Sequence, residues 1–315
     1  MSFSSDVKDE LSRQISNARH CQIAEITAII SLCGDIIISA NDNYRIRVST
    51  ENVAVARKYF TLLKRTFNID TEISIKNHTH LNKGRTYMIL TKNHEDSMKI
   101  LKATRLLNNE NDIEEEMSLV NNLVVQQLCC RRAFIRGAFL AAGSISDPNK
   151  FYHFEIVCSS EAKAIQLCDI INTFELDAKI VARKKYFVVY IKEGTQIVEI
   201  LNIMEAHVSL MNLENVRILK EMRNSVNRKV NCETANLNKT VEAALKQIKD
   251  IEYIRDTVGL ETLSPPLYEL AQVRLNNPDT PLKDLGQLLS EPVGKSGVNH
   301  RLKKISEIAD NLREN

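Results

Sequence analysis

The sequence has few of the residues that mark nucleotide pockets, disulfide frameworks and membrane spans. Only nine of its 315 residues are glycine, which argues against a glycine-rich phosphate loop, and the Gly-x-Ser-x-Gly signature of serine hydrolases is absent. Its seven cysteines include no Cys-x-x-Cys pair, so the sequence predicts neither a disulfide framework nor a metal site. No run approaches the roughly 20 apolar residues that a membrane-spanning helix needs.

The remaining composition is typical of a globular protein in a reducing compartment. Hydrophobic residues make up 43% of the chain and charged residues 26%, which is the balance of a folded domain rather than a disordered one. The cysteine count is odd, and several cysteines lie in apolar runs, as buried thiols do. The opening stretch, MSFSSDVKDELSRQ, is polar and acidic and does not resemble a signal peptide. We therefore expect a cytoplasmic protein without membrane association.

Charge is distributed unevenly along the chain, although the net charge of +2 is too balanced to indicate nucleic-acid binding by itself. Residues 217–249 carry eight Lys and Arg against three acids, and residues 294–304 carry four against none. The acidic run NNENDIEEEM, at 108–117, has the opposite sign. Basic residues gathered in this way are the electrostatic pattern of a nucleic-acid contact.

An internal repeat with an offset of 109 residues relates AEITAIISLCGDI, at 24–36, to AFIRGAFLAAGSI, at 133–145. Residues spaced by four share one face of a helix. Gly inside a helix costs roughly 1 kcal/mol relative to Ala, so close packing of the two copies would explain Gly137, whereas the alternative is an ordinary Ala-rich core helix. The small residues at this spacing are Ala24, Ala28, Ala133, Gly137 and Ala141.

The segments after each small-residue helix repeat as well. The strand-like YRIRVST and FYHFEIVCS each lead into a helix, then into two more extended segments and a closing helix, near 93–104 and 194–205. This order predicts an α+β pseudo-dimer over residues 1–213, with repeats at about 20–105 and 128–210. The two small-residue helices would lie at its pseudo-twofold axis.

This order, together with FIRGAFLAAGSI, resembles the LAGLIDADG homing-endonuclease fold, a pseudo-twofold αββαββα repeat. In that family the motif helix ends in an acid followed by Gly, and the acid holds the divalent metal for phosphodiester cleavage. Here the acid positions hold Cys33 and Ala142, and neither is a hard oxygen ligand. We therefore expect no catalytic residues, no metal, no cofactor and no enzymatic activity. A nuclease with displaced acids is the alternative, and the nearest acids are Asp35 and Asp147.

A polar, basic and Asn-rich segment occupies residues 214–250. We expect a connector whose cations contact the phosphates of DNA, while a solvated linker helix is the alternative. The predicted phosphate-contacting residues are Arg217, Arg223, Arg228 and Lys229.

Residues 251–315 read as an all-α helix-turn-helix domain. A helix ending near Gly259 and another starting at Ser264 precede the short helix LKDLGQLLS, with Thr280 as its cap and Pro281 at its first position. EPVGK is a turn, and Ser296 is expected to cap the last helix. Two short helices joined by a turn, the second basic at its start, are typical of a helix-turn-helix.

The start of the last helix is predicted to enter the major groove of double-stranded DNA. Asn and Arg can bond base edges bidentately, whereas Lys and Ser suit phosphate. The alternative is a small helical bundle that happens to be basic. The predicted core residues are Val298, Leu302, Ile305 and Ile308. The predicted DNA-binding residues are Lys283, Lys295, Ser296, Asn299, His300, Arg301, Lys303 and Lys304.

Several strings that span nearly the whole chain resemble the WhiA family of sporulation regulators of Gram-positive bacteria: MSFSSDVKDELSR, RGAFLAAGSI, MRNSVNRKVNCETANLNKT and LKDLGQLL followed by KSGVNHRLKKI. The resemblance implies a degenerate LAGLIDADG-like domain joined to a helix-turn-helix domain. It also implies a nucleoid-associated, DNA-binding regulator linked to sporulation, cell division and chromosome segregation, with another regulator or division protein as a further partner. A protein-interaction scaffold with secondary DNA binding is the alternative function.

Three further features have an ordinary structural interpretation. His78-Thr79-His80 has no further ligand near it in sequence and reads as a loop, and Cys129-Cys130 reads as buried thiols in preference to a redox switch. Residues 45–102 carry twelve Lys and Arg against five acids, which favours a solvated face over a second DNA-facing saddle.

Overall fold

The computed structural model describes residues 2–39, 43–77, 84–107 and 122–314, so the acidic run and His78-Thr79-His80 lie outside the described residues. The chain divides into two units, Met1–Lys220 and Glu221–Asn315, and each is described by itself. Among the described helices, none is both long enough and apolar enough to cross a bilayer.

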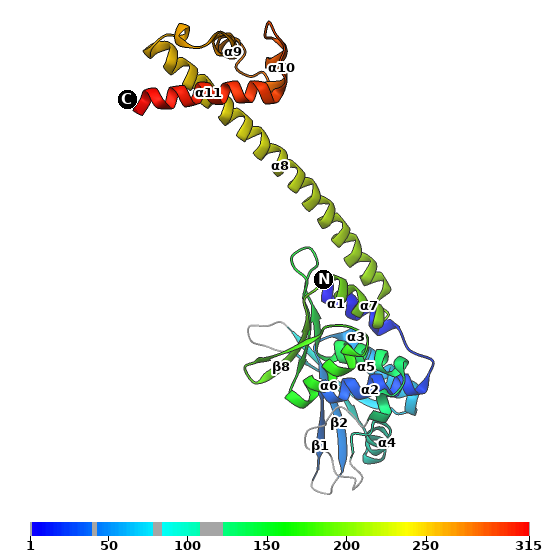
Figure 1. Cartoon of the computed structure of the whole chain (residues 1–315). Coiled ribbons are helices and arrows are strands. Elements are labelled where there is room, and N and C mark those ends of the chain that lie inside the picture. The colour runs from blue at the N-terminus through cyan, green and yellow to red at the C-terminus, as the bar shows by residue number, and fades with distance from the viewer. Residues whose placement is uncertain (1, 40–42, 78–83, 108–121, 315) are drawn as a thin grey trace. The chain divides into compact units, whose positions relative to one another are not determined.

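Two copies of an αββαββα repeat make up most of the first unit (Figure 1). The predicted fold class is therefore confirmed, and β2 has the bounds that the sequence predicts. The first copy runs α2 (Arg19–Cys33), β1 (Gly34–Ile38), β2 (Tyr44–Thr50), α3 (Val53–Phe67), β3 (Thr71–Asn77), β4 (Arg85–Thr91) and α4 (His94–Thr104). The second runs α5 (Leu128–Ala142), β5 (Gly143–Ile145), β6 (Phe154–Cys158), α6 (Glu161–Asn172), β7 (Lys179–Arg183), β8 (Tyr186–Ile191) and α7 (Gly194–Ile203).

Each copy builds one four-stranded antiparallel sheet, with strand orders β1-β2-β4-β3 and β5-β6-β8-β7. The motif glycine opens the edge strand in both, since Gly34 pairs with Val48 and Gly143 with Ile156. The two sheets therefore share one strand order, and in each the motif glycine pairs with the second strand of its repeat. This symmetry matches the 109-residue repeat in the sequence. Side chains alternate along β2, so Ile46 and Val48 are buried against the helices and Arg47, which lies between them, points to the other face.

The small-residue helices α2 and α5 pack directly against each other, as the repeat predicts. A Cβ atom on Gly137 would lie 2.6 Å from the carbonyl oxygen of Glu25 and 3.0 Å from the Cβ of Ala28. Ala24 and Ala133 are buried in the same core. The glycine is therefore required by a backbone approach that no larger residue permits.

A buried charge network lies beside this contact. The carboxylate of Glu25 in α2 lies 2.9 Å from Lys58 Nζ of α3 and 3.3 Å from Arg136 Nε of α5. The Glu25 side chain has no exposed surface. Lys58 also donates to the carbonyl oxygen of Leu11 at 3.0 Å, and Arg136 donates to the carboxylate of Glu205 at 2.7 Å. The Glu25 carboxylate thus joins α2 and α3 of the first repeat to α5 of the second repeat.

The helix α8 (His207–Thr257) is 51 residues long. Glu10 of α1 (Phe3–Arg13) caps its start, because the Glu10 carboxylate accepts from the backbone N–H groups of Val208 at 2.8 Å and Ser209 at 2.9 Å. The basic connector and the helix predicted to follow it are one continuous helix. Its predicted end is confirmed, since the chain leaves the helix at Gly259, with φ of 81°.

The second unit is all-α with a core of its own. After the end of α8 come a 3-10 turn (Leu260–Thr262), α9 (Pro265–Asn276), α10 (Leu282–Gln287) and α11 (Lys295–Glu314). The buried core includes Ile251, Ile254, Leu270, Ala271, Leu285, Val298, Leu302, Ile305 and Ala309.

Two predicted helix starts in this unit are wrong, by one residue for α10 and by two residues for α11. Pro281 is the N-cap of α10 and not its first helical residue, so Thr280 lies one position outside. The helix α11 begins at Lys295, and the backbone N–H of Val298 bonds the carbonyl oxygen of Gly294 at 3.1 Å. Ser296 therefore lies inside the first turn and does not cap it.

Replacing Gly137 with alanine should destabilise the first unit. We expect Gly137→Ala to lower the free energy of unfolding by about 1–3 kcal/mol, because the new Cβ overpacks against the backbone of α2. Urea unfolding followed by circular dichroism measures the change. Gly194→Ala is the matched control, since its Cβ would meet the Tyr152 ring at an ordinary 3.5 Å. Wild-type stability of Gly137→Ala would contradict the close approach.

Candidate nucleic-acid interface

A tight turn joins α10 to α11, and Gly286 makes it possible. The backbone N–H of Val293 donates to the carbonyl oxygen of Gly286 at 3.0 Å, which closes the turn. A Cβ at Gly286 would collide with the Val293 carbonyl oxygen and lie 3.0 Å from Val298 Cγ2. The glycine thus sets how the second helix of the pair leaves the first, as a helix-turn-helix requires.

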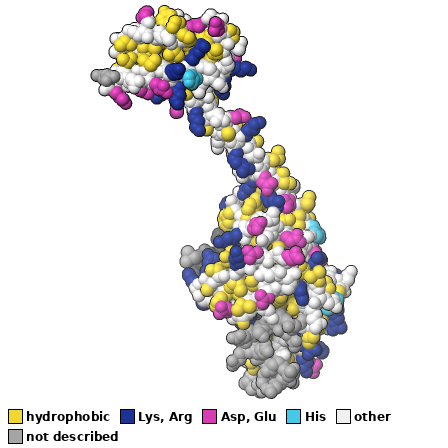
Figure 2. All heavy atoms as spheres, viewed as in Figure 1, with side chains coloured by type: hydrophobic (Ala, Val, Ile, Leu, Met, Phe, Trp, Pro, Cys, Tyr) yellow, Lys and Arg dark blue, Asp and Glu magenta, His cyan; other side chains and the backbone are white. Residues whose placement is uncertain are grey.

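The helix α11 buries one stripe and exposes the opposite face. Val298, Leu302 and Ile305 are buried as predicted, and Ala309 continues the stripe while Ile308 is only partly buried. Lys, Arg and His side chains are interspersed over the visible face of this unit (Figure 2). The exposed residues among those predicted to bind DNA are Lys283, Lys295, Ser296, Asn299, His300, Lys303 and Lys304.

Arg301 differs from the other predicted contacts because it is only half exposed and flanks the buried stripe. It lies close enough to Glu269 of α9 to influence that carboxyl: hydrogen bonds from Ser290 first, and then the charge of Arg301, lower the pKa of Glu269. The Glu269 carboxylate accepts the backbone N–H of Ser290 at 2.6 Å. Arg301 therefore has a neighbour within the unit as well as a position beside the exposed face.

The far end of α11 is fastened to α8. The Arg313 guanidinium donates to the buried carboxylate of Asp250 and to Asp310, each at 2.7 Å, and lies 4.9 Å from the centre of the Tyr253 ring. These contacts hold the last turn of α11, whereas the exposed cations lie on its first turns. The exposed cationic face and the anchored end are thus different parts of one helix.

The predicted connector residues all lie on α8. Arg223, Arg228 and Lys229 are exposed and belong to the second unit. Arg217 belongs to the first unit and is half-buried, with its guanidinium 3.1 Å from the Glu214 carboxylate. The four residues are therefore not one group, because Arg217 already has an acidic partner.

The two positions where an endonuclease motif would place acids contain no carboxylate in the folded chain. The Cys33 thiol donates to the carbonyl oxygen of Ile29 at 3.2 Å, and burial raises its pKa to about 12. Ala142 offers no ligand atom. Asp35 is paired with Arg47 at 2.9 Å, and the exposed Asp147 carboxylate accepts from the backbone and side chain of Asn149.

The exposed face of the first sheet carries matched charges. Arg45 pairs with Glu72 at 3.0 Å, and Arg47 pairs with Asp35. The arginines of β2 are thus neutralised by acids on the neighbouring part of the same sheet. This pairing agrees with the preference for a solvated face over a DNA-binding saddle.

The structure also groups four side chains that sequence reasoning did not connect: His20, Cys21, Cys129 and Cys130. The repeat contained the signal, because the 109-residue offset places His20 on Cys129 and Cys21 on Cys130.

Three family models match the chain in succession. The model described as the WhiA N-terminal LAGLIDADG-like domain matches residues 19–107. The WhiA LAGLIDADG-like domain matches residues 131–223, and the WhiA C-terminal HTH domain matches residues 226–309.

Curated proteins and a solved structure match over the full length. A protein of Lachnoclostridium phytofermentans named "Probable cell division protein WhiA" is 55% identical over 314 residues and covers 100% of both chains. A protein of the same name from Alkaliphilus oremlandii is 50% identical over 100% of this chain and 98% of its own. The crystal structure of full-length WhiA from Thermotoga maritima matches with a TM-score of 0.60 at 24% identity over 99% of each chain, which shows the shared fold.

Replacing Gly286 with alanine should disturb the helix-turn-helix itself. We expect Gly286→Ala to destabilise the second unit by about 1–3 kcal/mol, because a Cβ there collides with backbone and not with a movable side chain. Thermal unfolding followed by circular dichroism provides the measurement. Gly297→Ala is the control, since its Cβ would contact Val293 at 3.4 Å. A destabilised Gly297→Ala beside an unaffected Gly286→Ala would refute this account of the turn.

Proposed function

The chain belongs to the WhiA family, and from that premise we propose that it is a DNA-binding transcriptional regulator without catalytic activity. Its relatives bear the name of probable cell division proteins, which supports a role in division. Sporulation and chromosome segregation are the other processes that we infer for it. Such a regulator would work in the cytoplasm, at the nucleoid.

The observation that carries this proposal is the exposed cationic face at the start of α11. Asn299, His300 and Lys303 lie opposite the buried stripe of an amphipathic helix that follows a tight turn. A helix in this position enters the major groove with its first turns against the base edges. We infer that Asn299 and His300 contact bases and that Lys295, Ser296, Lys303 and Lys304 contact phosphates, because side chains of these kinds suit those partners.

Arg301 has a mixed role in this proposal. Its half-buried position near Glu269 means that its removal affects the unit as well as the DNA contact. Lys283 of α10 and the exposed Arg223, Arg228 and Lys229 of α8 would add phosphate contacts that position the protein without selecting a sequence. Arg217, which is paired with Glu214, contributes least.

The first unit is inferred to lack nuclease activity. The two motif positions present a half-buried thiol whose pKa is raised and a methyl group, and Asp35 is paired with Arg47. Neither arrangement supplies the hard oxygen ligands that Mg²⁺ requires. The unit would instead provide a second DNA contact or a surface for another regulator or division protein.

A protein-interaction scaffold is the second candidate function, and the exposed apolar residues of α8 favour it. Met222, Val226, Val230, Leu237 and Val241 are all exposed, whereas apolar side chains on a purely solvated helix are scattered. In that case DNA binding would be secondary.

Salt-dependent DNA binding tests the main proposal. Lys303→Ala should weaken binding to duplexes of any sequence and reduce the slope of log K against log salt by about 1, because one phosphate contact is lost. Asn299→Ala should instead cost about 1–3 kcal/mol of discrimination at one base pair of a selected target. Fluorescence anisotropy with labelled duplexes measures both effects.

Lys102→Ala is the control for these variants, because Lys102 is an exposed cation on α4. That helix packs on the buried face of the first sheet, with Ile46 and Val48, and not on the face that carries Arg45 and Arg47. The substitution makes the same change in net charge and should leave both the affinity and the salt slope unchanged. If Lys303→Ala and Lys102→Ala behave alike, α11 does not hold the DNA interface. If the protein binds no duplex even at low salt, the scaffold function replaces the proposed one.

Supercoiled plasmid should stay intact when incubated with the protein and Mg²⁺ or Mn²⁺. Agarose electrophoresis reads the result, and Asp35→Asn separates true activity from a contaminating nuclease. Nicking by the wild-type protein that disappears in Asp35→Asn would overturn the non-catalytic assignment. Nicking that persists in both Asp35→Asn and Asp147→Asn would identify a contaminant.

A further inference from the structure

Two dipeptides, His20-Cys21 and Cys129-Cys130, meet in the first unit. Their four ligand atoms all lie within 4.8 Å of one another. The His20 Nδ1 atom is 3.1 Å from Cys130 Sγ and 3.4 Å from Cys21 Sγ. All four side chains therefore point to one small volume, although the dipeptides are 109 residues apart.

The two dipeptides occupy equivalent places in the repeat. His20 and Cys21 are the second and third residues of α2, and Cys129 and Cys130 are the second and third residues of α5. The cluster therefore lies where the two axis helices begin, at the opposite ends of these helices from Cys33 and Ala142.

We propose that His20, Cys21, Cys129 and Cys130 bind one zinc ion and so join the starts of α2 and α5. Three sulfur atoms and one imidazole nitrogen are a common tetrahedral donor set for structural zinc. Zn–S and Zn–N bonds of about 2.3 and 2.0 Å place tetrahedral ligand atoms about 3.5–3.8 Å apart. The observed separations need only small side-chain rotations to reach that geometry.

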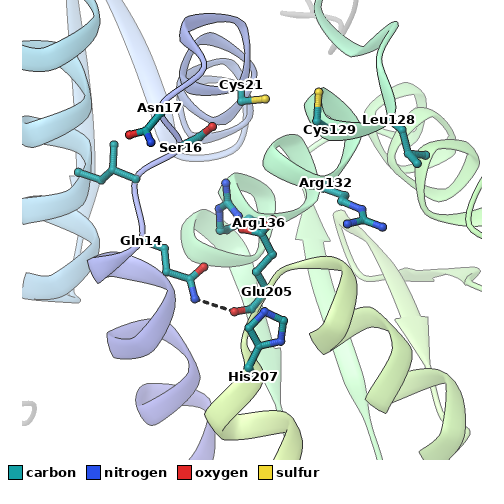
Figure 3. A pocket seen from close by; sticks show the side chains of 11 residues that line it. Gln14, Ser16, Asn17, Cys21, Leu128, Cys129, Arg132, Arg136, Glu205 and His207 are labelled. Atoms are coloured by element: carbon teal, nitrogen blue, oxygen red, sulfur yellow. Dashed lines mark hydrogen bonds and ion pairs between the residues drawn. The ribbon is translucent and has the colours of Figure 1, made fainter.

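The surroundings give an ion both access and charge balance. Cys21 and Cys130 are buried while His20 and Cys129 are exposed, so the cluster is open on one side. Figure 3 shows Cys21 and Cys129 at facing helix ends, in a pocket that Arg132 and Arg136 also line. Three thiolates on one Zn²⁺ leave a net charge of −1, and the nearby Arg132 would offset it.

Two other interpretations of the cluster make different predictions. Ordinary thiols would make only a hydrogen bond between Cys130 and the His20 nitrogen, at 3.1 Å, and would take up no metal. A disulfide would join two of the three cysteines and leave His20 and one thiol outside the bond. A zinc site alone uses all four groups, and it does not depend on the proposed DNA binding.

The test uses the full chain without a polyhistidine tag, purified with a phosphine reductant, stripped of metal and titrated with zinc chloride. We expect one equivalent to bind, with elemental analysis after gel filtration as the measure. Cobalt chloride should give the visible absorption of tetrahedral cobalt with thiolate charge-transfer bands. Both the amount of bound zinc and the cobalt absorption should stop increasing at one ion per chain.

Cys129→Ser removes a ligand from an exposed position and so spares the core. It should weaken zinc binding more than about 100-fold, because losing even a supporting partner of a ligand costs about 10–100-fold. Cys232→Ser is the matched control, since Cys232 is an exposed cysteine on α8, and it should bind like wild type. Circular dichroism checks that each variant is folded.

Three results would overturn the proposal. The first is a reduced, folded chain that takes up neither zinc nor cobalt. The second is undiminished zinc binding by folded Cys129→Ser, or an equal loss in Cys232→Ser. The third is a cobalt complex without thiolate charge-transfer bands, which would locate the metal elsewhere on the chain.

Discussion

The contact between α2 and α5 is the constraint on which the first unit depends. The helices approach closely because Gly137 has no side chain to hold them apart. The contact is specific because the buried Glu25 carboxylate forms ion pairs with both Lys58 and Arg136. Removing one partner of a buried ion pair leaves an uncompensated charge and costs about 3–5 kcal/mol. The same network reaches Glu205, just before α8, so the start of α8 is tied to the packing of the central helices of this unit.

Much of this fold could be predicted from local patterns. The repeat was visible because the same small residues recur at the same spacing, and strands such as β2 and β4 have a clear β-branched and alternating character. The pairing of Glu25 with Lys58 could not be predicted, because the residues belong to separate helices and only the folded chain brings them together. The continuity of α8 was also missed, because apolar residues such as Met222, Val226 and Val230 are separated by Asn, Lys and Arg, and the segment reads as a polar connector rather than as part of a helix.

The candidate sites, too, could be predicted only where one helix supplies all the residues involved. The exposed face of α11 could be predicted because one helix supplies both the buried stripe and the residues opposite it. Arg301 could not be separated from its neighbours, because its half-buried position and its electrostatic effect on Glu269 of a different helix arise only in the folded chain. The histidine and cysteines at the helix starts have no ligand spacing of the usual kind, since two ligands come from each of two distant helices. Their relation is visible only when the repeat offset is applied to residues outside the small-residue stripe.

The positions of the packing and ion-pairing residues along the axis helices explain why the fold does not require acids at the two motif positions. Gly137, Glu25 and Arg136 lie within the helices, and the histidine and cysteines lie at their starts. Cys33 and Ala142 lie at the other ends, where the chain turns into β1 and β5. The close approach at Gly137 and the ion pairs of Glu25 involve neither of them, so these contacts do not require a carboxylate at either position. The contact between the axis helices is therefore independent of acids at the motif positions, and the basic face that we propose for DNA is carried by a unit with its own core.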